Sequence, residues 1–338
     1  MPQRLILCFD GTWNKPDPNP DPAARIETNV VKFYEGVTEG DIGDGFTQSK
    51  WYDEGVGTNW YDQVLGGAFG LGLDQKIQDG YRWLARHYPD PDPGDVEIYV
   101  LGFSRGAYTA RSLVGMIRNV GLLKQVNLHR LQDAYTLYRD RADPVDSDNA
   151  VIFRQQYSRN IRITFLGVWD TVGALGIPLQ ALQWVNSTQY AFHDTALSRI
   201  VANAFQALAI DEHRIDFQAT LWTDKPDLGQ TVEQRWFIGA HGDVGGGDPD
   251  HLLSDIALAW MMEKAEALGL VLDQTQQPAI SQTNWDAGIY DSYGNFLDGI
   301  YAQTHPPYYR PMMTTPTNEV KDESVAERTD YDPPNPGF

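Results

Sequence analysis

The stretch from Val96 to Asn119, VEIYVLGFSRGAYTARSLVGMIRN, decides the fold of this chain. It begins with an apolar, β-branched run typical of a buried strand and continues, after Gly106, with apolar residues at helical spacing. Ser104 lies at the junction, in a G-x-S-x-G sequence bounded by Gly102 and Gly106. A strand, a sharp turn with an exposed serine and a helix form the context that a nucleophilic serine requires. The alternative is a Gly-Ser turn that only joins a strand to a helix.

The two glycines have a physical explanation in this context. A serine in such a turn has a strained backbone, and Gly102 and Gly106 allow the strand and the helix to pass close to each other without a Cβ clash. The start of the helix behind Ser104 supplies free N–H groups and a partial positive charge for an oxyanion. The stretch therefore predicts a serine nucleophile.

Strand and helix patterns alternate on both sides of this stretch. Alternation of this kind predicts an α/β fold with a mainly parallel central sheet, helices on both faces and active-site loops at the carboxyl ends of the strands. Besides the strand before Ser104, we expect strands at residues 4–9, 48–53, 161–169, 217–222 and 234–238, and helices at 28–34, 74–87, 126–141, 194–209 and 252–268.

The sequence shows no internal repeat and no linker that divides two domains. We expect a catalytic domain over residues 1–270 and a C-terminal extension over 271–338 that packs on the same domain. The extension is polar, aromatic and rich in proline, and its tyrosines, Tyr308 and Tyr309, are expected to pack on the domain surface. Its last residues are expected to be poorly ordered.

The composition bounds the function. The chain has 338 residues, of which 42% are hydrophobic, enough for a sizeable core. Its formal net charge of −20 argues against a nucleic-acid partner and against unaided adsorption to an anionic membrane. The apolar run at the N-terminus is too short for a signal peptide, and no stretch is long enough to span a bilayer. We expect no integral membrane association, and a cytoplasmic location or export without a cleavable signal. The oligomeric state is left open.

Polar residues follow four of the predicted strands, at Asp10, Ser104, Asp170 and His241. Because the carboxyl ends of parallel strands lie at one edge of a sheet, these side chains can converge. A serine is a weak nucleophile at neutral pH; a histidine can take its proton, and an aspartate can fix the histidine tautomer and stabilise the imidazolium. Ser104, Asp170 and His241 also stand in the chain order of α/β-hydrolase triads. We predict that they form a catalytic triad.

His241 is chosen from seven histidines because it alone follows a predicted strand and lies in a glycine-rich loop. His213, for example, has no predicted strand before it. The alternative for His241 is a solvent-exposed loop residue, and the alternative for Asp170 is a helix N-cap. Asp243 is a rival acid, but it is two residues from His241 and is more consistent with shaping the glycine loop or capping a helix.

The remaining candidate residues surround the predicted nucleophile. The backbone N–H groups of Thr12 and Arg105 are the candidate oxyanion donors, although Thr12 is also consistent with an ordinary turn. Asp10 and Gly11 are expected to shape the loop beside the serine. No metal site and no cofactor are predicted, because the proposed chemistry needs neither.

Six motifs extend these observations over most of the chain. In this order and with these sequences they resemble the α/β-hydrolase family that includes the catalytic domains of type VI secretion phospholipase effectors. The resemblance covers roughly residues 1–270 and is far more specific than the serine motif alone. The motifs are FDGTWN (9–14), YDEGVGT (52–58), GFSRGA (102–107), GVWDTVG (167–173), DEHRIDFQATLW (211–222) and GAHGDVGGG (239–247).

The resemblance implies a Ser-Asp-His lipase or esterase, with the triad at Ser104, Asp170 and His241. One departure is Gly242, where the family usually has serine after the histidine. Effector members also carry additional membrane-engaging regions, whereas this chain shows no long apolar amphipathic segment.

Two other functions remain open. Asp10-Gly11-Thr12 after a strand is similar to the D-x-D-G-T motif of haloacid-dehalogenase-like phosphatases, which are metal-dependent, but the nucleophilic aspartate of that motif is replaced by Cys8. A non-catalytic lipid- or carbohydrate-binding protein on a hydrolase scaffold is the other, given 17 tyrosines and 10 tryptophans. Most of these aromatic residues are expected to pack in the core.

The stretch from residue 171 to 193 follows the predicted acid directly. It carries more apolar residues than an exposed loop should, among them Trp184. One interpretation is a lid or acyl-pocket wall over Ser104, since ligand pockets are mostly apolar. The other is a helix that completes the core. In the first case Trp184 contacts the acyl chain of a small-molecule or lipid ester substrate.

Overall fold

The structure is a computed structural model. It describes residues 2–11, 14–21, 24–55, 68–140, 144–172, 197–315, 318–328 and 330–331, and of residues 68–71 only the backbone. Thr12, Trp184 and residues 332–338, on which predictions were made, lie outside these ranges.

An eight-stranded sheet forms the centre of the molecule, in the order β10-β9-β8-β7-β4-β1-β3-β2. All neighbouring strands in it are parallel except β2 and β3. The prediction of a mainly parallel sheet is therefore confirmed. The strands are β1 (Gln3–Phe9), β2 (Gly40–Asp41), β3 (Thr47–Asp53), β4 (Val96–Phe103), β7 (Ile163–Trp169), β8 (Val201–Ala209), β9 (Thr231–Phe237) and β10 (Glu319–Lys321), with β5 (Leu122–Leu123) and β6 (Ser158–Arg159) in a separate pair.

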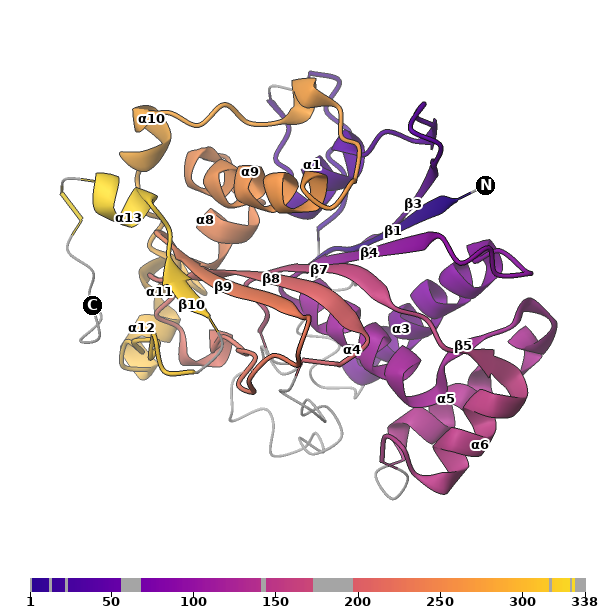
Figure 1. Cartoon of the computed structure of the whole chain (residues 1–338). Helices are drawn as coiled ribbons and strands as arrows, with labels where there is room; N and C mark the ends of the chain where they lie inside the picture. The colour runs from indigo at the N-terminus through magenta and orange to yellow at the C-terminus, as the bar shows by residue number, and fades with distance from the viewer. Residues whose placement is uncertain are drawn as a thin grey trace.

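Helices cover both faces of the sheet (Figure 1), with α1 and α9 on one face and α3 and α4 on the other. No helix in the described part of the chain is both long and apolar enough to cross a membrane. The helices are α1 (Asn29–Gly36), α3 (Ala68–His87), α4 (Arg105–Val120), η2 (Gln125–Arg130), α5 (Leu131–Arg139), α6 (Asp148–Tyr157), η4 (Ile215–Phe217), α8 (His241–Gly245), α9 (Leu252–Glu266), η5 (Gln274–Gln276), α10 (Gln282–Trp285), α11 (Ser292–Asn295), α12 (Ile300–Thr304) and α13 (Ser324–Glu327), of which η2, η4 and η5 are 3₁₀ helices.

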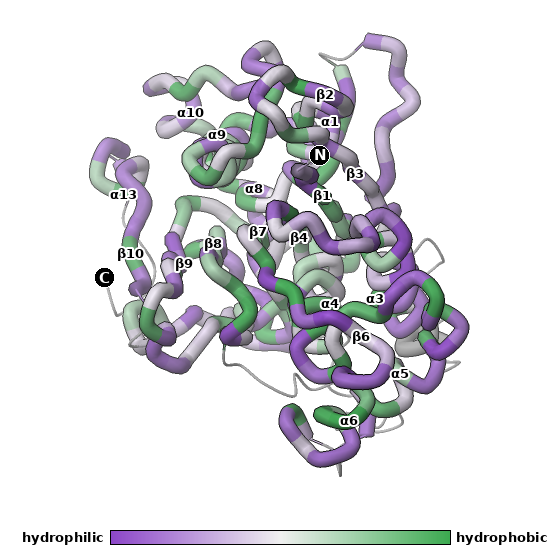
Figure 2. The backbone as a smooth tube through the Cα atoms, turned by 45° about the vertical axis from the view of Figure 1, so that its right-hand side comes forward, coloured by the Kyte–Doolittle hydropathy of each residue, from purple (hydrophilic) through white to green (hydrophobic). Residues whose placement is uncertain are grey.

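The core lies in two layers, one on each face of the sheet. Successive residues of β1 alternate between them: Leu5 and Leu7 pack with α3 and α4, whereas Ile6 packs with α1 and α9. Side chains of a strand alternate in this way, so a strand covered on both faces reads as a continuous apolar run. Hydrophobic residues accordingly follow the central strands, and hydrophilic residues predominate in the outer loops (Figure 2).

The helix predicted at 194–209 is wrong, because residues Val201–Ala209 form strand β8. The alanine-rich sequence VANAFQALA has helical propensity, but β8 is paired on both sides, with β7 and β9, and is buried over most of its length. Tertiary pairing therefore overrides local propensity. His213 does follow a strand, contrary to the prediction; its Nδ1 lies 3.0 Å from the Tyr308 carbonyl oxygen.

The strand predicted at 217–222 is also absent. Ile215–Phe217 form a 3₁₀ turn, and the residues that follow make only an isolated bridge between Ala219 and Val172. The helix predicted at 126–141 is divided into η2 and α5.

The strand register places the carboxyl ends of the central strands at one edge of the sheet. Phe103 of β4 lies beside Trp169 of β7, and Ala209 of β8 lies beside Phe237 of β9. The residues that follow these strands therefore start from the same edge.

Residues after position 270 contribute to the same sheet. β10 pairs with β9, and Leu272 forms a bridge with Val37. The division into a catalytic domain to residue 270 and an extension beyond it stays a prediction.

Candidate active site

Ser104 stands at the turn between β4 and α4 with a left-handed backbone, φ 56°. Its N–H donates to the Trp169 carbonyl oxygen at 3.0 Å. A Cβ atom at Gly106 would lie 2.1 Å from the Phe9 carbonyl oxygen, and one at Gly102 would lie 2.5 Å from the Gly106 carbonyl oxygen. Both positions therefore require glycine, as the sequence predicts for a strained turn between closely packed elements.

The structure brings Ser104, His241 and Asp170 together. Nε2 of His241 is hydrogen-bonded to Oγ of Ser104 at 2.8 Å, and Nδ1 of His241 to Oδ2 of Asp170 at 2.6 Å. The rings of Phe103 and Phe217 pack against the imidazole, with centroids 4.6 and 5.3 Å away. All three polar side chains are buried, so the imidazole orientation is fixed by hydrogen bonds at both nitrogens and by the two aromatic rings packed against it.

Asp170 is held by a second, unpredicted partner, Arg310. Nη1 of Arg310 donates to Oδ1 of Asp170 at 2.6 Å and Nη2 donates to Oδ2 at 3.0 Å. The same guanidinium donates to the carbonyl oxygens of Ala209 and Phe217. Burial would raise the pKa of Asp170, but the charge of Arg310 and the hydrogen bond from His241 outweigh it and hold the pKa well below its usual range. Asp170 is therefore ionised throughout the neutral range.

Asp243, the rival acid, bonds to backbone groups. Its Oδ2 accepts from the N–H groups of Ala240 at 2.9 Å and Tyr290 at 3.0 Å. Asp243 is the third residue of the short helix α8, so its side chain caps the start of that helix, one of the two parts expected for it. Burial raises the pKa of this carboxyl to about 6.

Replacing Asp243 with asparagine is expected to change the pH dependence of stability. Because the pKa of Asp243 is higher in the folded state than its ordinary 3.8, the wild-type protein loses stability as pH rises from about 4 to about 6. Asparagine carries no charge and can still accept both backbone bonds. The melting temperature of Asp243→Asn relative to wild type should therefore be higher at pH 8 than at pH 4. A difference that does not vary with pH would contradict the burial argument.

Asp10 ties the loop after β1 to its surroundings. Its Oδ1 accepts from the N–H of Gly11 at 2.6 Å, and its Oδ2 accepts from the hydroxyls of Thr28 and Tyr52 at 2.8 and 2.6 Å. A Cβ atom at Gly11 would lie 3.5 Å from Cβ of Ser104. The Gly11 backbone thus lies directly beside the serine.

The two candidate oxyanion donors differ in what the structure shows. Arg105 is the first residue of α4, so its N–H belongs to the first turn of a helix, where N–H groups have no partner within the helix itself. Burial lowers the pKa of its guanidinium to about 9. Thr12 lies outside the described residues, as do Trp184 and most of the stretch 171–193 that was considered as a lid.

A cleft of about 330 Å³ opens onto Ser104 and His241. One wall comes from the serine and histidine loops, and another comes from the C-terminal region. The residues lining it are Gly11, Asn14, Phe103, Ser104, Arg105, Arg214, Phe217, His241, Gly242, Gly246, Gly247, Asp248, Tyr290, Ser292, Asn295, Phe296 and Leu297.

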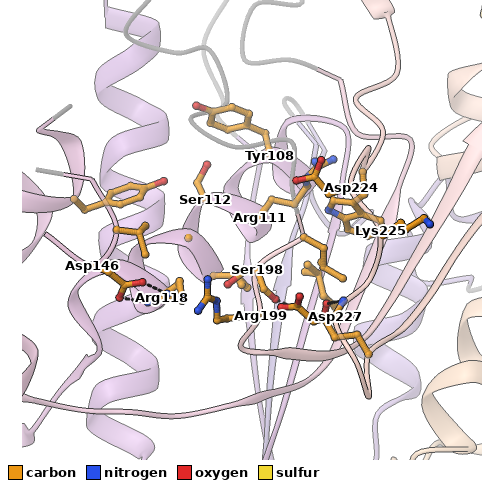
Figure 3. A pocket seen from close by; sticks show the side chains of 18 residues that line it. Tyr108, Arg111, Ser112, Arg118, Asp146, Ser198, Arg199, Asp224, Lys225 and Asp227 are labelled. Carbon is orange, nitrogen blue, oxygen red and sulfur yellow. Dashed lines mark hydrogen bonds and ion pairs between the residues drawn. The ribbon is translucent and has the colours of Figure 1, made fainter. Parts of the chain in front are cut away.

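A second cavity, of about 400 Å³, lies beside α4, from Tyr108 to Arg118 (Figure 3). Tyr108, Arg111 and Ser112 reach it from α4, and Arg118 on the same helix is paired with Asp146. None of the described residues that line it is a histidine. Among those residues it lacks the base that the cleft at Ser104 contains.

The sequence is similar to a known family and to a protein from yeast. Residues 3–264 match the family described as the type VI secretion Tle1-like phospholipase effector, catalytic domain. Arg310 lies beyond that match. Over 248 residues, 66% of the chain, the sequence is 31% identical to the uncharacterized protein YEL023C of Saccharomyces cerevisiae. The chain spans about a third of that protein's length.

Two solved structures are similar at low identity. An uncharacterized protein from Pseudomonas aeruginosa aligns over 89% of this chain and 51% of its own, with a TM-score of 0.47 and 19% identity. The Tle1 effector bound to the VgrG spike of the type VI secretion system aligns over 73% of this chain and 52% of its own, with a TM-score of 0.44 and 18% identity. The chain thus spans about half of each.

Proposed function

The chain belongs to the family of Tle1-like catalytic domains of type VI secretion phospholipase effectors, and from that premise we propose that it is a serine ester hydrolase that acts on lipid esters through an acyl-enzyme. Ser104 is the nucleophile, His241 the general base and Asp170 the acid that orients the histidine. The observation that carries the proposal is the unbroken hydrogen-bond chain from Ser104 through His241 to Asp170, which opens onto the cleft.

The reaction runs in two halves. Oγ of Ser104 attacks the ester carbonyl while Nε2 of His241 takes the hydroxyl proton, and the N–H groups of Arg105 and Thr12 stabilise the oxyanion. The tetrahedral intermediate collapses, and the imidazolium gives its proton to the departing alcohol. Water then attacks the acyl-enzyme, giving its proton to His241, and collapse releases the acid and restores the Ser104 hydroxyl.

The lipid nature of the substrate rests on the family and on the cleft. Phe217, Phe296 and Leu297 give the cleft an apolar wall, as binding sites for acyl groups require. We propose a phospholipid or related ester as substrate, no nucleic-acid partner, and a cytoplasmic location or export without a cleavable signal peptide.

A panel of p-nitrophenyl esters of increasing acyl length, measured beside phospholipids, tests the proposed activity. We expect hydrolysis with higher kcat/KM for longer acyl chains, because only a longer acyl chain can contact the apolar wall of the cleft. Absence of hydrolysis across the whole panel would contradict an ester hydrolase. A binding protein on the same scaffold would retain these ligands without turnover.

A metal-dependent phosphohydrolase is the alternative function. Cys8, at the position of that motif's nucleophile, is fully buried in β1, and both oxygens of Asp10 accept hydrogen bonds from protein groups. Within the described ranges no group of three or more His, Cys, Asp or Glu side chains is placed to hold a metal ion.

Chelation separates the two functions. Ester hydrolysis is expected to be unchanged by EDTA, because the proposed steps need no Lewis acid. Activity should be assayed before and after dialysis against EDTA, with a p-nitrophenyl ester and p-nitrophenyl phosphate as parallel substrates. Loss of activity that a divalent ion restores would favour the phosphohydrolase.

A further inference from the structure

Arg214 is a buried cation that lines the cleft beside Ser104. Its Nε donates to Oε1 of Glu212 at 2.8 Å, and its Nη2 donates to Oε2 at 2.6 Å. Two aromatic rings pack against the guanidinium, with the Phe217 centroid 3.6 Å and the Phe296 centroid 4.8 Å from its carbon. The side chain is only 9% exposed, and the orientation of the guanidinium is fixed by Glu212 along one edge and by the packing of these rings.

Both carboxylate oxygens of Glu212 accept hydrogen bonds from protein groups. Besides Arg214 it accepts from the N–H of His241 at 3.3 Å and from the hydroxyl of Ser292 at 3.1 Å. Burial would raise the pKa of Glu212, but the hydrogen bond and charge of Arg214 lower it. Glu212 therefore holds the Arg214 side chain and the backbone at His241 in fixed positions relative to each other.

The Nη1 group of Arg214 takes no part in the contacts with Glu212. Among the described residues no hydrogen bond engages Nη1, although the rest of the side chain is held at hydrogen-bond distance by Glu212. Arg214 belongs to the lining of the same cleft as Ser104. A fixed guanidinium edge with two free N–H bonds is a preorganised donor for an anionic oxygen.

A carboxylate lies on the same cleft, at Asp248. A Cβ atom at Gly242 would lie 2.0 Å from Oδ2 of Asp248, so the carboxylate occupies the space that a side chain after His241 would need. This explains why glycine stands at position 242. No hydrogen bond to Asp248 is formed within the described part of the chain, and Asp248 lines the cleft. It is an available acceptor for a positively charged group.

We propose that Arg214 and Asp248 together recognise the zwitterionic headgroup of a phospholipid, with Nη1 of Arg214 donating to the phosphodiester and the Asp248 carboxylate binding the ammonium. The inference rests on the proposed ester hydrolase function and assigns two residues of that site to the selection of the headgroup. The apolar wall at Phe296 and Leu297 remains for the acyl chain. A neutral diacylglycerol can use the wall but neither charge.

The test compares phosphatidylethanolamine, phosphatidylglycerol and diacylglycerol with identical acyl chains in mixed detergent micelles. Arg214→Lys keeps a charge opposite Glu212, but its single ammonium cannot both pair with Glu212 and donate into the cleft. Its kcat/KM for both phospholipids should fall about tenfold or more relative to diacylglycerol, the size expected for losing a hydrogen bond to a charged group. Arg214→Met should show the same split if it folds.

Asp248→Asn isolates the ammonium contact. It should lower kcat/KM for phosphatidylethanolamine relative to phosphatidylglycerol several-fold, which is the effect expected for the loss of one contact between charged groups. Arg199→Met, which removes an exposed arginine at the second cavity, is the matched control and should leave all ratios unchanged.

Failure of the headgroup contacts and failure of the hydrolase function give different results in these assays. Equal losses on all three lipids in Arg214→Lys would assign Arg214 to holding Glu212 and the histidine loop, and would overturn the phosphate contact. An unchanged headgroup ratio in Asp248→Asn would overturn the ammonium contact. If wild-type protein cleaves neither these lipids nor p-nitrophenyl esters, the hydrolase function and the inference fall together.

Discussion

Replacing Ser104 with alanine is expected to abolish ester hydrolysis and to leave the fold intact. The loss in kcat should be on the order of 10⁶-fold, as when the nucleophile of a serine hydrolase is removed. The backbone at this position is left-handed, φ 56°, but alanine meets the same strain as serine, so the cost is present in both proteins. The hydroxyl contributes one hydrogen bond, to Nε2 of His241. The melting temperature should therefore change little.

Ser112→Ala is the matched control for this variant. Ser112 lies on the same helix, α4, but lines the second cavity instead of the cleft (Figure 3). Its replacement should preserve activity on p-nitrophenyl esters and on lipids. Full activity in Ser104→Ala, or equal losses in both variants, would contradict the assignment of the nucleophile.

Replacing Asp170 with asparagine should lower kcat by a factor on the order of 10⁴, because asparagine favours the wrong histidine tautomer. Two further effects follow from the structure. The variant leaves the Arg310 guanidinium buried without its counter-ion, and it loses the bidentate ion pair that fixes the carboxylate. Thermal stability should therefore fall as well, which a melting curve separates from the kinetic loss.

Asp243→Asn tests whether Asp170 is the correct acid of the triad. Variants of Arg310 test whether the arginine positions the Asp170 carboxylate. Asp243→Asn should cost far less in kcat, since its carboxylate bonds to Ala240 and Tyr290. Arg310→Lys keeps a positive charge beside Asp170 and should retain more activity than Arg310→Met, which should lower kcat by about 10²-fold through misplacement of the carboxylate. A larger loss for Asp243→Asn than for Asp170→Asn would show that the acid is assigned wrongly.

The strands around Ser104 could be predicted because their signals are local. The run Val96–Phe103 is apolar except at Glu97, and the glycines at 102 and 106 mark close backbone approach, which the Phe9 and Gly106 carbonyl oxygens explain. β8 could not be predicted in the same way. Its residues favour a helix in isolation, and only pairing with β7 and β9 makes the segment a strand.

The charged partners of the site were missed for a related reason. Arg310 stands in the proline- and tyrosine-rich stretch PPYYRP, where no periodicity marks a buried residue, yet it is only 2% exposed. Glu212 and Arg214 stand in DEHR, the start of one of the motifs that carry the family resemblance. The motif alone does not reveal that Glu212 accepts hydrogen bonds from both Arg214 and the His241 N–H. The contacts of Arg310 with Asp170 and of His241 with Glu212 join residues far apart in the sequence, which contains no local signal for them.

Covalent labelling with a fluorophosphonate tests the central claim most directly. The reagent phosphonylates an activated serine and releases fluoride, so it reports the nucleophile without knowledge of the substrate. After incubation of the wild-type protein and peptide mapping by mass spectrometry, we predict one label, on Ser104, with loss of esterase activity in proportion to labelling. Labelling should be absent in Ser104→Ala. Esterase activity that persists in fully labelled protein, or a label on another serine that accounts for the loss of activity, would contradict the account.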